Sequence, residues 1–318
     1  MPESKGHLNP GANGVHLDRF ELGPGLSDLV RHVWVGRWAV PDGDVRPQRL
    51  LTYPALNAVI MPGLAALHGP DPRVQVQELR GTSWVVGILF RPAAGPLLTA
   101  TDPVELVGSS EPLPAAPAGR LEQIMVGAGR NGGSGTGTGD SATRGRGDGA
   151  SGDGGSAAGD RCDRDAGDWM DRDRIERDRA ELVLVLRAWL RPAAADVDDR
   201  GRLVNEACRL AETDPALTRA ADLAARLGVS PRSLERLVRA HIGLTPKWLI
   251  ECRRLQHAAT TLYGAPGTDL SALAADLGYT DYPHFFRQYQ RVLGESPRTT
   301  RERGRDAEGP ANRGAQPP

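Results

Sequence analysis

Leu223-Ala-Ala-Arg-Leu-Gly-Val-Ser230 recurs fifty residues later in the chain as Leu273-Ala-Ala-Asp-Leu-Gly-Tyr-Thr280. Two leucines, two alanines and the glycine coincide in register. A second block follows each copy at nearly the same distance, Gly243-Leu-Thr-Pro246 after the first and Gly294-Glu-Ser-Pro297 after the second. We therefore treat the two segments as copies of one structural unit.

The first copy predicts two short helices joined by a tight turn. Leu223, Ala224 and Leu227 share one face of the first helix, and Gly228 can adopt the positive φ that a turn requires. Ser230 is expected to cap the second helix, with Pro231 at its first position, where no amide hydrogen is needed. The residues expected to pack this helix are Leu234, Leu237 and Val238, up to a stop at Gly243.

The second copy predicts the same helix-turn-helix. Gly278 takes the turn position, Thr280 is the expected cap and Gly294 the expected end. The residues expected to pack its second helix are Phe285, Phe286, Tyr289 and Val292. The small alanine beside each turn lets the two helices cross closely.

A longer helix is expected between the copies, beginning at Thr245-Pro246. Its apolar residues form one stripe at spacings of three and four, namely Trp248, Cys252, Leu255, Ala258 and Leu262. A helix of about seventeen residues is roughly 25 Å long. On one face of DNA the major groove recurs about every 34 Å, which is one helical turn. Two helix-turn-helix motifs joined by this helix could therefore enter successive major grooves on that face.

Residues from about 204 to 301 resemble the DNA-binding domain of the AraC/XylS family of bacterial transcription regulators. The resemblance is carried by Leu223-Ala224, Gly228-Val-Ser-Pro231, Gly243-Leu-Thr-Pro246, Arg254-Leu-Gln-His-Ala258, Leu262, Leu273-Ala274, Gly278-Tyr-Thr-Asp281, His284-Phe285, Arg287 and Gly294-Glu-Ser-Pro297. It implies seven helices and binding to double-stranded promoter DNA. Leu237-Val238 stand where the family usually has an aromatic residue, which concerns packing more than base reading.

Early residues of a recognition helix that face away from the core reach base edges. In the first motif these are Arg232, Ser233, Glu235 and Arg236. Either arginine could bond a guanine in bidentate fashion and Glu235 could accept from cytosine. The alternative for Glu235 and Arg236 is an ordinary solvated face.

The corresponding residues of the second motif have fewer hydrogen-bonding groups. They are Tyr282, Pro283 and Arg287, with His284 nearby, so this motif is expected to read DNA shape and thymine methyl groups more than donor patterns. The expected phosphate contacts are Arg239, Arg291, Arg298 and Thr299. The segment from Ser230 to Arg303 contains eleven basic and seven acidic residues, which is a modest local excess of positive charge.

The fold class that we expect is α+β multidomain, with an all-α double helix-turn-helix domain after a small β-rich domain and a disordered Gly-rich linker. The expected divisions are a β-rich sensing or dimerisation domain (1–126), the Gly/Asp/Arg-rich linker (127–170), a connecting helix (171–200), the double helix-turn-helix domain (201–303) and a disordered tail (304–318). Arg191-Pro192 should end the connecting helix.

The N-terminal domain is predicted from short apolar runs at 33–40, 57–61, 74–79 and 83–90. Its segment 28–98 is similar to a β-rich domain of some AraC-type regulators, notably in Pro54-Ala-Leu-Asn57-Ala-Val-Ile and Val86-Gly-Ile-Leu-Phe-Arg-Pro92. The tryptophans at positions 34, 38 and 84 either line an effector pocket or form plain core. Asn57 and Arg91 either anchor an anionic ligand or satisfy turns and backbone carbonyls.

Composition argues against several other classes of protein. The 39 basic and 40 acidic side chains rule out a chain that is basic throughout. Three scattered cysteines fit neither disulfides nor a zinc site, and no apolar run suits a signal peptide or a membrane span, so we expect a cytoplasmic protein. His16, His32 and His68 are too far apart for a metal site. The 196–201 stretch starts like a calcium loop, but Ala207 replaces the ligand at its twelfth position.

These observations favour a one-component transcription regulator with neither cofactor nor metal. Its expected partner is promoter DNA, and RNA polymerase, a small effector and a second copy of the chain are further candidates. Two alternatives remain open. One is a DNA-binding protein whose β domain does no sensing, and the other is an enzymatic β domain fused to a helix-turn-helix domain.

Overall fold

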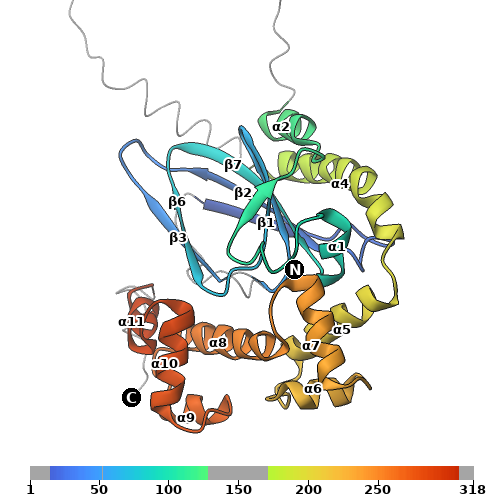
Figure 1. Ribbon diagram of the computed structural model, residues 1–318. Helices are drawn as coiled ribbons and strands as arrows, with labels where there is room; N and C mark the ends of the chain where they lie inside the picture. Colours follow the sequence, from blue (N-terminus) through green and yellow to red (C-terminus); the bar gives the residue numbers. More distant parts are fainter. Residues whose placement is uncertain (1–14, 52, 128–170, 308–318) are drawn as a thin grey trace, which may run out of the picture.

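The computed structural model describes residues 15–51, 53–127 and 171–307, and the expected Gly-rich linker lies outside them from residue 128 on. Figure 1 shows a β-sheet region above a group of helices. A β-rich N-terminal region followed by a helical C-terminal region is the architecture that the sequence predicted.

The main sheet is antiparallel and has six strands in the order β1-β2-β7-β4-β5-β8. Its strands are β1 Val15–Phe20, β2 Val30–Ala39, β7 Thr82–Phe90, β4 Asn57–Met61, β5 Leu64–His68 and β8 Ser110–Pro112. A separate ribbon pairs β3 Arg46–Leu51 with β6 Val74–Leu79. All four runs that the sequence indicated are strands, and β1, β3, β5 and β8 were missed because they are short or polar.

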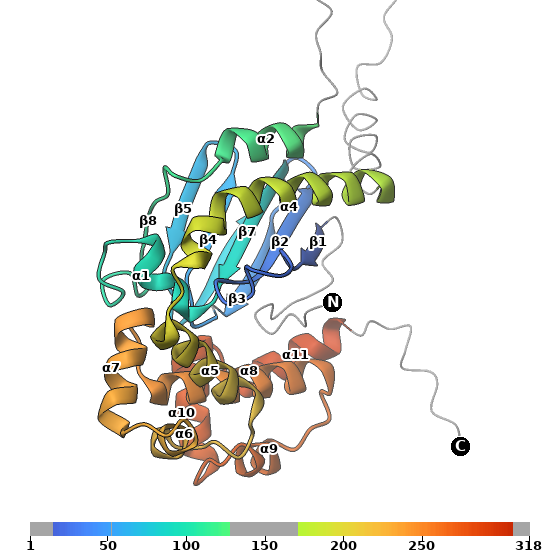
Figure 2. The same cartoon turned by 90° about the vertical axis from the view of Figure 1, so that its right-hand side faces the viewer.

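Two helices cover one face of this sheet, α2 Ala118–Val126 and α4 Arg172–Ala195 (Figure 2). Leu182, Leu186 and Leu190 of α4 are fully buried in one core with strand residues such as Val86 and Ile88. Further short helices, η1 Pro92–Ala94 and α1 Gly95–Leu98, follow β7.

The expected connecting helix is therefore part of the N-terminal core. Two ion pairs also join α4 to the sheet, Arg37–Asp178 at 2.6 Å and Arg179–Asp18 at 2.8 Å. The prediction that Pro192 ends the helix is wrong, since α4 continues to Ala195. A proline near the C-terminal end of a helix removes a single hydrogen bond there, and the packing of Leu186 and Leu190 on the sheet holds this end in place.

Seven helices form the C-terminal region between residues 199 and 307. They are α5 Asp199–Thr213, α6 Ala220–Arg226, α7 Pro231–Ile242, α8 Pro246–Gly264, α9 Leu270–Asp276, α10 Tyr282–Leu293 and α11 Pro297–Ala307. One apolar cluster joins α5, α6, α7 and the start of α8, and a second joins the rest of α8 with α9 and α10. Trp248 packs against both clusters, so the two motifs meet at α8.

The expected start of the tail at residue 304 is also wrong. The last helix continues to Ala307, and Gly304 is buried against the backbone of Tyr263, where an added Cβ would come within 2.2 Å of the carbonyl oxygen. The polar sequence of α11 gave no sign of this, because a close backbone contact leaves no apolar pattern. The chain beyond Ala307 lies outside the described residues.

Candidate DNA-binding surface

The first candidate recognition helix, α7, begins and ends where the sequence predicted. The Ser230 hydroxyl accepts a hydrogen bond from the Ser233 amide at 3.1 Å, which satisfies one of the free amides of the first turn. Gly243 ends the helix with a φ of 76°, and Gly228 has a φ of 67° in the turn before it. These positive values favour glycine at both positions.

The second candidate recognition helix, α10, has a different cap from the expected one. Asp281 is the N-cap, and its carboxylate accepts from the His284 amide at 2.7 Å. The prediction of Thr280 is therefore wrong. The cap follows the turn glycine by three residues in this motif and by two in the first, so aligning the two copies on the glycine places the cap one residue too early.

Four expected DNA contacts of the first motif project into solvent. Arg232, Glu235, Arg236 and Arg239 are exposed on α7, opposite the buried face of Leu234, Leu237 and Val238. Within the described ranges none of these four side chains makes a hydrogen bond or ion pair. Ser233 is half-buried, and its hydroxyl lies 2.9 Å from that of Ser230, so it takes part in the cap.

The second motif offers fewer free polar groups. Pro283 and Arg287 are exposed, whereas Tyr282 and His284 are half-buried among aromatic rings. The Tyr282 ring centroid lies 6.1 Å from that of Phe285, and His284 meets Tyr279 edge-on at 5.4 Å. These contacts leave Arg287 as the exposed charged group on the early turns of α10.

Two of the expected phosphate contacts already have partners within the domain. Arg291 lies 3.7 Å from the carboxylate of Glu251 on α8. Thr299 belongs to the first turn of α11, where its amide donates to Ser296 at 3.1 Å and the two hydroxyls lie 2.8 Å apart. Arg298 is exposed beside them.

The arrangement places the two recognition helices at opposite ends of α8 (Figure 1). With 19 residues, α8 is about 28 Å long at 1.5 Å per residue. Both helices have twelve residues, and each ends at a glycine with positive φ. The geometry is that of two equivalent helix-turn-helix units on one connecting helix.

The N-terminal residues singled out for ligand binding mostly serve the fold. Trp38 and Trp84 are buried core residues, and the Trp34 ring lies over Gly87 while its indole nitrogen donates to Asn57 Oδ1 at 3.2 Å. The guanidinium of Arg91 donates to the Ser27 carbonyl oxygen at 2.6 Å. Arg91 thus satisfies a backbone carbonyl, which was one of the two alternatives, whereas Asn57 bonds the side chain of Trp34.

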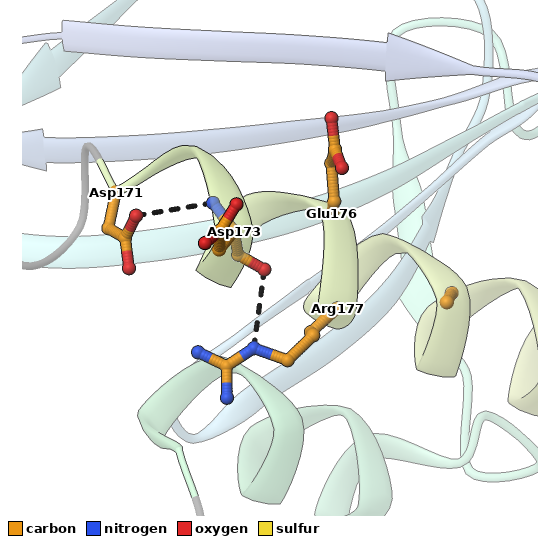
Figure 3. A pocket seen from close by; sticks show the side chains of 5 residues that line it. Asp171, Asp173, Glu176 and Arg177 are labelled. Atoms are coloured by element: carbon orange, nitrogen blue, oxygen red, sulfur yellow. Dashed lines mark hydrogen bonds between the residues drawn. The ribbon is translucent and has the colours of Figure 1, made fainter.

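A hollow at the start of α4 is lined by Asp171, Asp173, Glu176, Arg177 and Ala180 (Figure 3). Asp171 accepts from the Asp173 amide at 3.2 Å, and Arg177 donates to the Asp173 carbonyl oxygen at 3.2 Å. All five lining residues are exposed. These contacts cap and solvate a helix end, so the hollow carries no ligand assignment.

Burial shifts the pKa of several titratable groups in the described residues. Burial raises the pKa of the Cys208 and Cys252 thiols, which keeps them neutral. Burial and the nearby Arg19 and Arg31 charges lower the pKa of His32 to about 4. The same residues contain no group of three or more side chains placed to hold a metal, and the 196–201 stretch caps α5 through Asp198, which accepts from the Gly201 amide at 2.7 Å.

Comparison with protein families gives two matches that together cover most of the described chain. Residues 223–303 match the model of a helix-turn-helix domain, and residues 19–112 match a domain of unknown function, DUF6597. No helix in the described ranges is long and apolar enough to cross a membrane.

Relatives support the C-terminal match. The chain is 35% identical over 85 residues to the HTH-type transcriptional activator RhaS of Escherichia fergusonii, an alignment that covers 27% of this chain and 30% of the relative. It thus spans less than a third of the length of that relative. The C-terminal region is therefore a helix-turn-helix domain that is similar to the one in this activator, in line with the resemblance seen in the sequence.

Solved structures are also similar to this chain, and two of them have TM-scores of 0.30 and 0.38. A probable AraC family transcriptional regulator from Rhodopseudomonas palustris is 28% identical, with a TM-score of 0.30, over 32% of this chain and 97% of that one. ToxT from Vibrio cholerae is 8% identical, with a TM-score of 0.38, over 92% of this chain and 98% of that one.

Proposed function

We propose that the protein is a transcription regulator that binds a promoter through two helix-turn-helix motifs in successive major grooves. The observation that carries this proposal is the pair of equal recognition helices at the ends of α8, each with exposed arginine on its early turns. Two recognition helices joined by α8 on one DNA face would select half-sites about one helical turn apart.

In this proposal the first motif supplies most of the direct base reading. Arg232 and Arg236 are exposed and unpaired within the described chain, so either can bond guanine O6 and N7, and Glu235 can accept from cytosine. Ser233 is more restricted because its hydroxyl faces the cap.

The second motif then reads shape as well as sequence. Arg287 is its one exposed charged side chain on the early turns, and Pro283 with the edge of Tyr282 offers an apolar surface suited to thymine methyl groups. His284 packs on Tyr279, which limits it to a peripheral contact.

Phosphate contacts would set the register of both helices on the duplex. Arg239 and Arg298 are exposed for this role, and Arg291 would exchange its ion pair with Glu251 for a phosphate oxygen. The N-terminal domain is proposed to modulate binding, either through a small effector or by pairing with a second copy, and the bound protein to act on RNA polymerase at the promoter.

Selection of DNA fragments by the full-length protein tests the proposal. We expect one enriched motif with two half-sites separated by about a helical turn. If no sequence is enriched, or only a single short site, the result would contradict binding through both helix-turn-helix motifs. Thermal unfolding with candidate metabolites, together with sedimentation of the free protein, would separate effector binding from self-association.

A further inference from the structure

A group of polar side chains joins the β-rich region to the first motif at the end of α5. Glu212, the next-to-last residue of α5, is 11% exposed at its side chain. Arg31 donates to both of its carboxylate oxygens, at 2.7 and 2.6 Å, and the Tyr53 hydroxyl donates to one of them at 2.9 Å. The Arg31 guanidinium also lies over the Tyr53 ring, 4.1 Å from its centroid.

The sheet has an irregularity where this contact forms. The register of β2 against β7 shifts between Val30 and His32, so Arg31 lies outside the regular pairing of the two strands. A bulge of this kind re-aims a side chain. Here it accompanies a side chain that reaches α5.

A third element meets the same residue. The Nε of Arg253, on α8, donates to the backbone carbonyl oxygen of Glu212. Glu212 therefore connects the β-rich region, the first motif and the helix that leads to the second motif. We call Arg31, Tyr53 and Glu212 the interface triad.

Other contacts hold the first motif against the β-rich region. Asn205 of α5 accepts from the Ala93 amide at 2.9 Å and donates to the Asp28 carbonyl oxygen at 2.7 Å. A Cβ added at Gly243 would come within 2.2 Å of the Pro103 carbonyl oxygen, so the end of α7 also lies close against this region. The early turns of α7 stay exposed in this arrangement, which leaves the candidate reading face open.

The directions of these bonds make the triad more selective than the apolar contacts around it. Burial of apolar surface is non-directional, so packing alone tolerates small rotations of one region on another. A bidentate arginine–carboxylate pair has a fixed geometry. Because both oxygens of Glu212 are occupied, the triad specifies one orientation of α5.

We propose that the interface triad positions the first helix-turn-helix so that both recognition helices bind DNA at a single half-site spacing. This inference rests on the proposed function. When one recognition helix has bound its half-site, the other is held near the second half-site at a high effective concentration. This concentration is higher when the distance between the two recognition helices is well defined. A loosened first motif would keep its affinity for one half-site and lose part of the gain from binding both.

The test compares the full-length protein with the variants Glu212→Gln and Tyr53→Phe on duplexes that carry the selected half-sites at spacings changed by one to five base pairs. Glu206→Gln is the matched control, since Glu206 pairs on the same helix with Arg209 on the surface. We expect Glu212→Gln to weaken binding at the selected spacing about tenfold, to leave a single half-site unaffected and to flatten the spacing profile. Tyr53→Phe, which keeps the ring under Arg31, should show a smaller effect in the same direction.

Three results would overturn the inference. A folded Glu212→Gln protein with the wild-type spacing profile would show that the triad does not position the motif. Equal weakening on double and single half-sites, with a lower Tm, would show a structural role only. If the wild-type protein enriches no double site, the proposed function itself falls and this inference with it.

Discussion

The two helix-turn-helix motifs have similar backbone structures and differ in their side chains. Each recognition helix has twelve residues between a capping residue and a glycine of positive φ. Counted from the cap, Arg236 and Arg287 occupy the same position. Arg232 of the first motif corresponds to Pro283 of the second, and Glu235 corresponds to Phe286. The duplicated scaffold thus carries two exposed faces of different chemistry.

The motifs also differ in what stabilises them. Aliphatic residues pack α7, and its end lies against the β-rich region at Pro103. Aromatic residues pack α10, where Phe285 meets Tyr289 edge-on at 5.4 Å and Tyr289 donates to Thr300 of α11 at 2.7 Å. The second motif builds its core on α8, with Val74 of β6 packed at its edge, and bonds to α11. The first motif has further contacts with the N-terminal region, through Asn205 and at Gly243.

Truncating the aromatic core should have the largest effect. Phe285 is fully buried, so Phe285→Ala should lower the free energy of unfolding by about 3–5 kcal/mol. Leu234 occupies the corresponding position of the first motif, and Leu234→Ala should cost about 2–5 kcal/mol. Urea unfolding of the full chain measures both, with exposed Gln290→Ala as the control. A loss below 1 kcal/mol for Phe285→Ala would contradict the aromatic core.

Acid should lower the stability of the N-terminal β-rich region, against which the first motif packs. The pKa of buried His32 is lowered to about 4, with Arg19 and Arg31 facing it and Glu212 acting the other way. A histidine with a lowered pKa in the folded state binds its proton more readily when unfolded, so its effect on stability appears as pH falls from about 6.5 towards 4. Between pH 7.5 and 5 the loss should be about 2 kcal/mol.

The variant His32→Gln should reduce this pH dependence without abolishing it. Burial also lowers the pKa of His68 and His241, which act in the same direction. Urea unfolding at pH 7.5 and pH 5 measures the difference between the two proteins. An unchanged slope would show that His32 is not responsible.

Base reading should depend on the first motif more than on the second. Arg236→Ala should weaken specific DNA binding by about 1–3 kcal/mol and relax preference at one base pair. Arg287→Ala, at the corresponding position, should weaken binding by less and relax no single base pair. Binding to selected and random duplexes distinguishes these effects. Equal weakening of both duplexes by Arg236→Ala would assign that arginine to phosphate contact.

The helix caps should give the smallest effects and a direct check of the register. Ser230→Ala and Asp281→Ala should each cost about 1 kcal/mol of stability because each removes a bond to a first-turn amide. Thr280→Ala, next to the observed cap, should change stability by less than about 0.5 kcal/mol. A larger cost for Thr280→Ala than for Asp281→Ala would restore the cap expected from the repeat.

Local signals in the sequence were sufficient for most of the helical region. The repeat, the turn glycines and the three- and four-residue spacings predicted α6 to α10, because these features depend on residues close together in the chain. The cap of α10 was missed by one residue, since the two copies differ by one residue between the turn glycine and the cap. Polar α11 had no apolar pattern beyond residue 303 to mark its extent.

Contacts between distant segments were not predictable in the same way. The sequence placed Arg31, Tyr53 and Glu212 in separate regions, and a strand irregularity, a loop and a helix end bring them together. Likewise Arg291 was expected to be free for phosphate, but α8 places Glu251 beside it. Pairings of this kind depend on the relative orientation of whole elements.

Two helix-turn-helix units on a connecting helix, after a β-rich region, could be predicted from local features of the sequence, because glycine conformation, helix capping and apolar periodicity depend on residues close together in the chain. The tertiary structure decided that α4 belongs to the N-terminal core and that the first motif is held against the β-rich region. The first arrangement buries the apolar face of α4 on the sheet. The second gives the side chains of Glu212 and Asn205 hydrogen-bond partners in the β-rich region. Both require surfaces that exist only once the elements have packed.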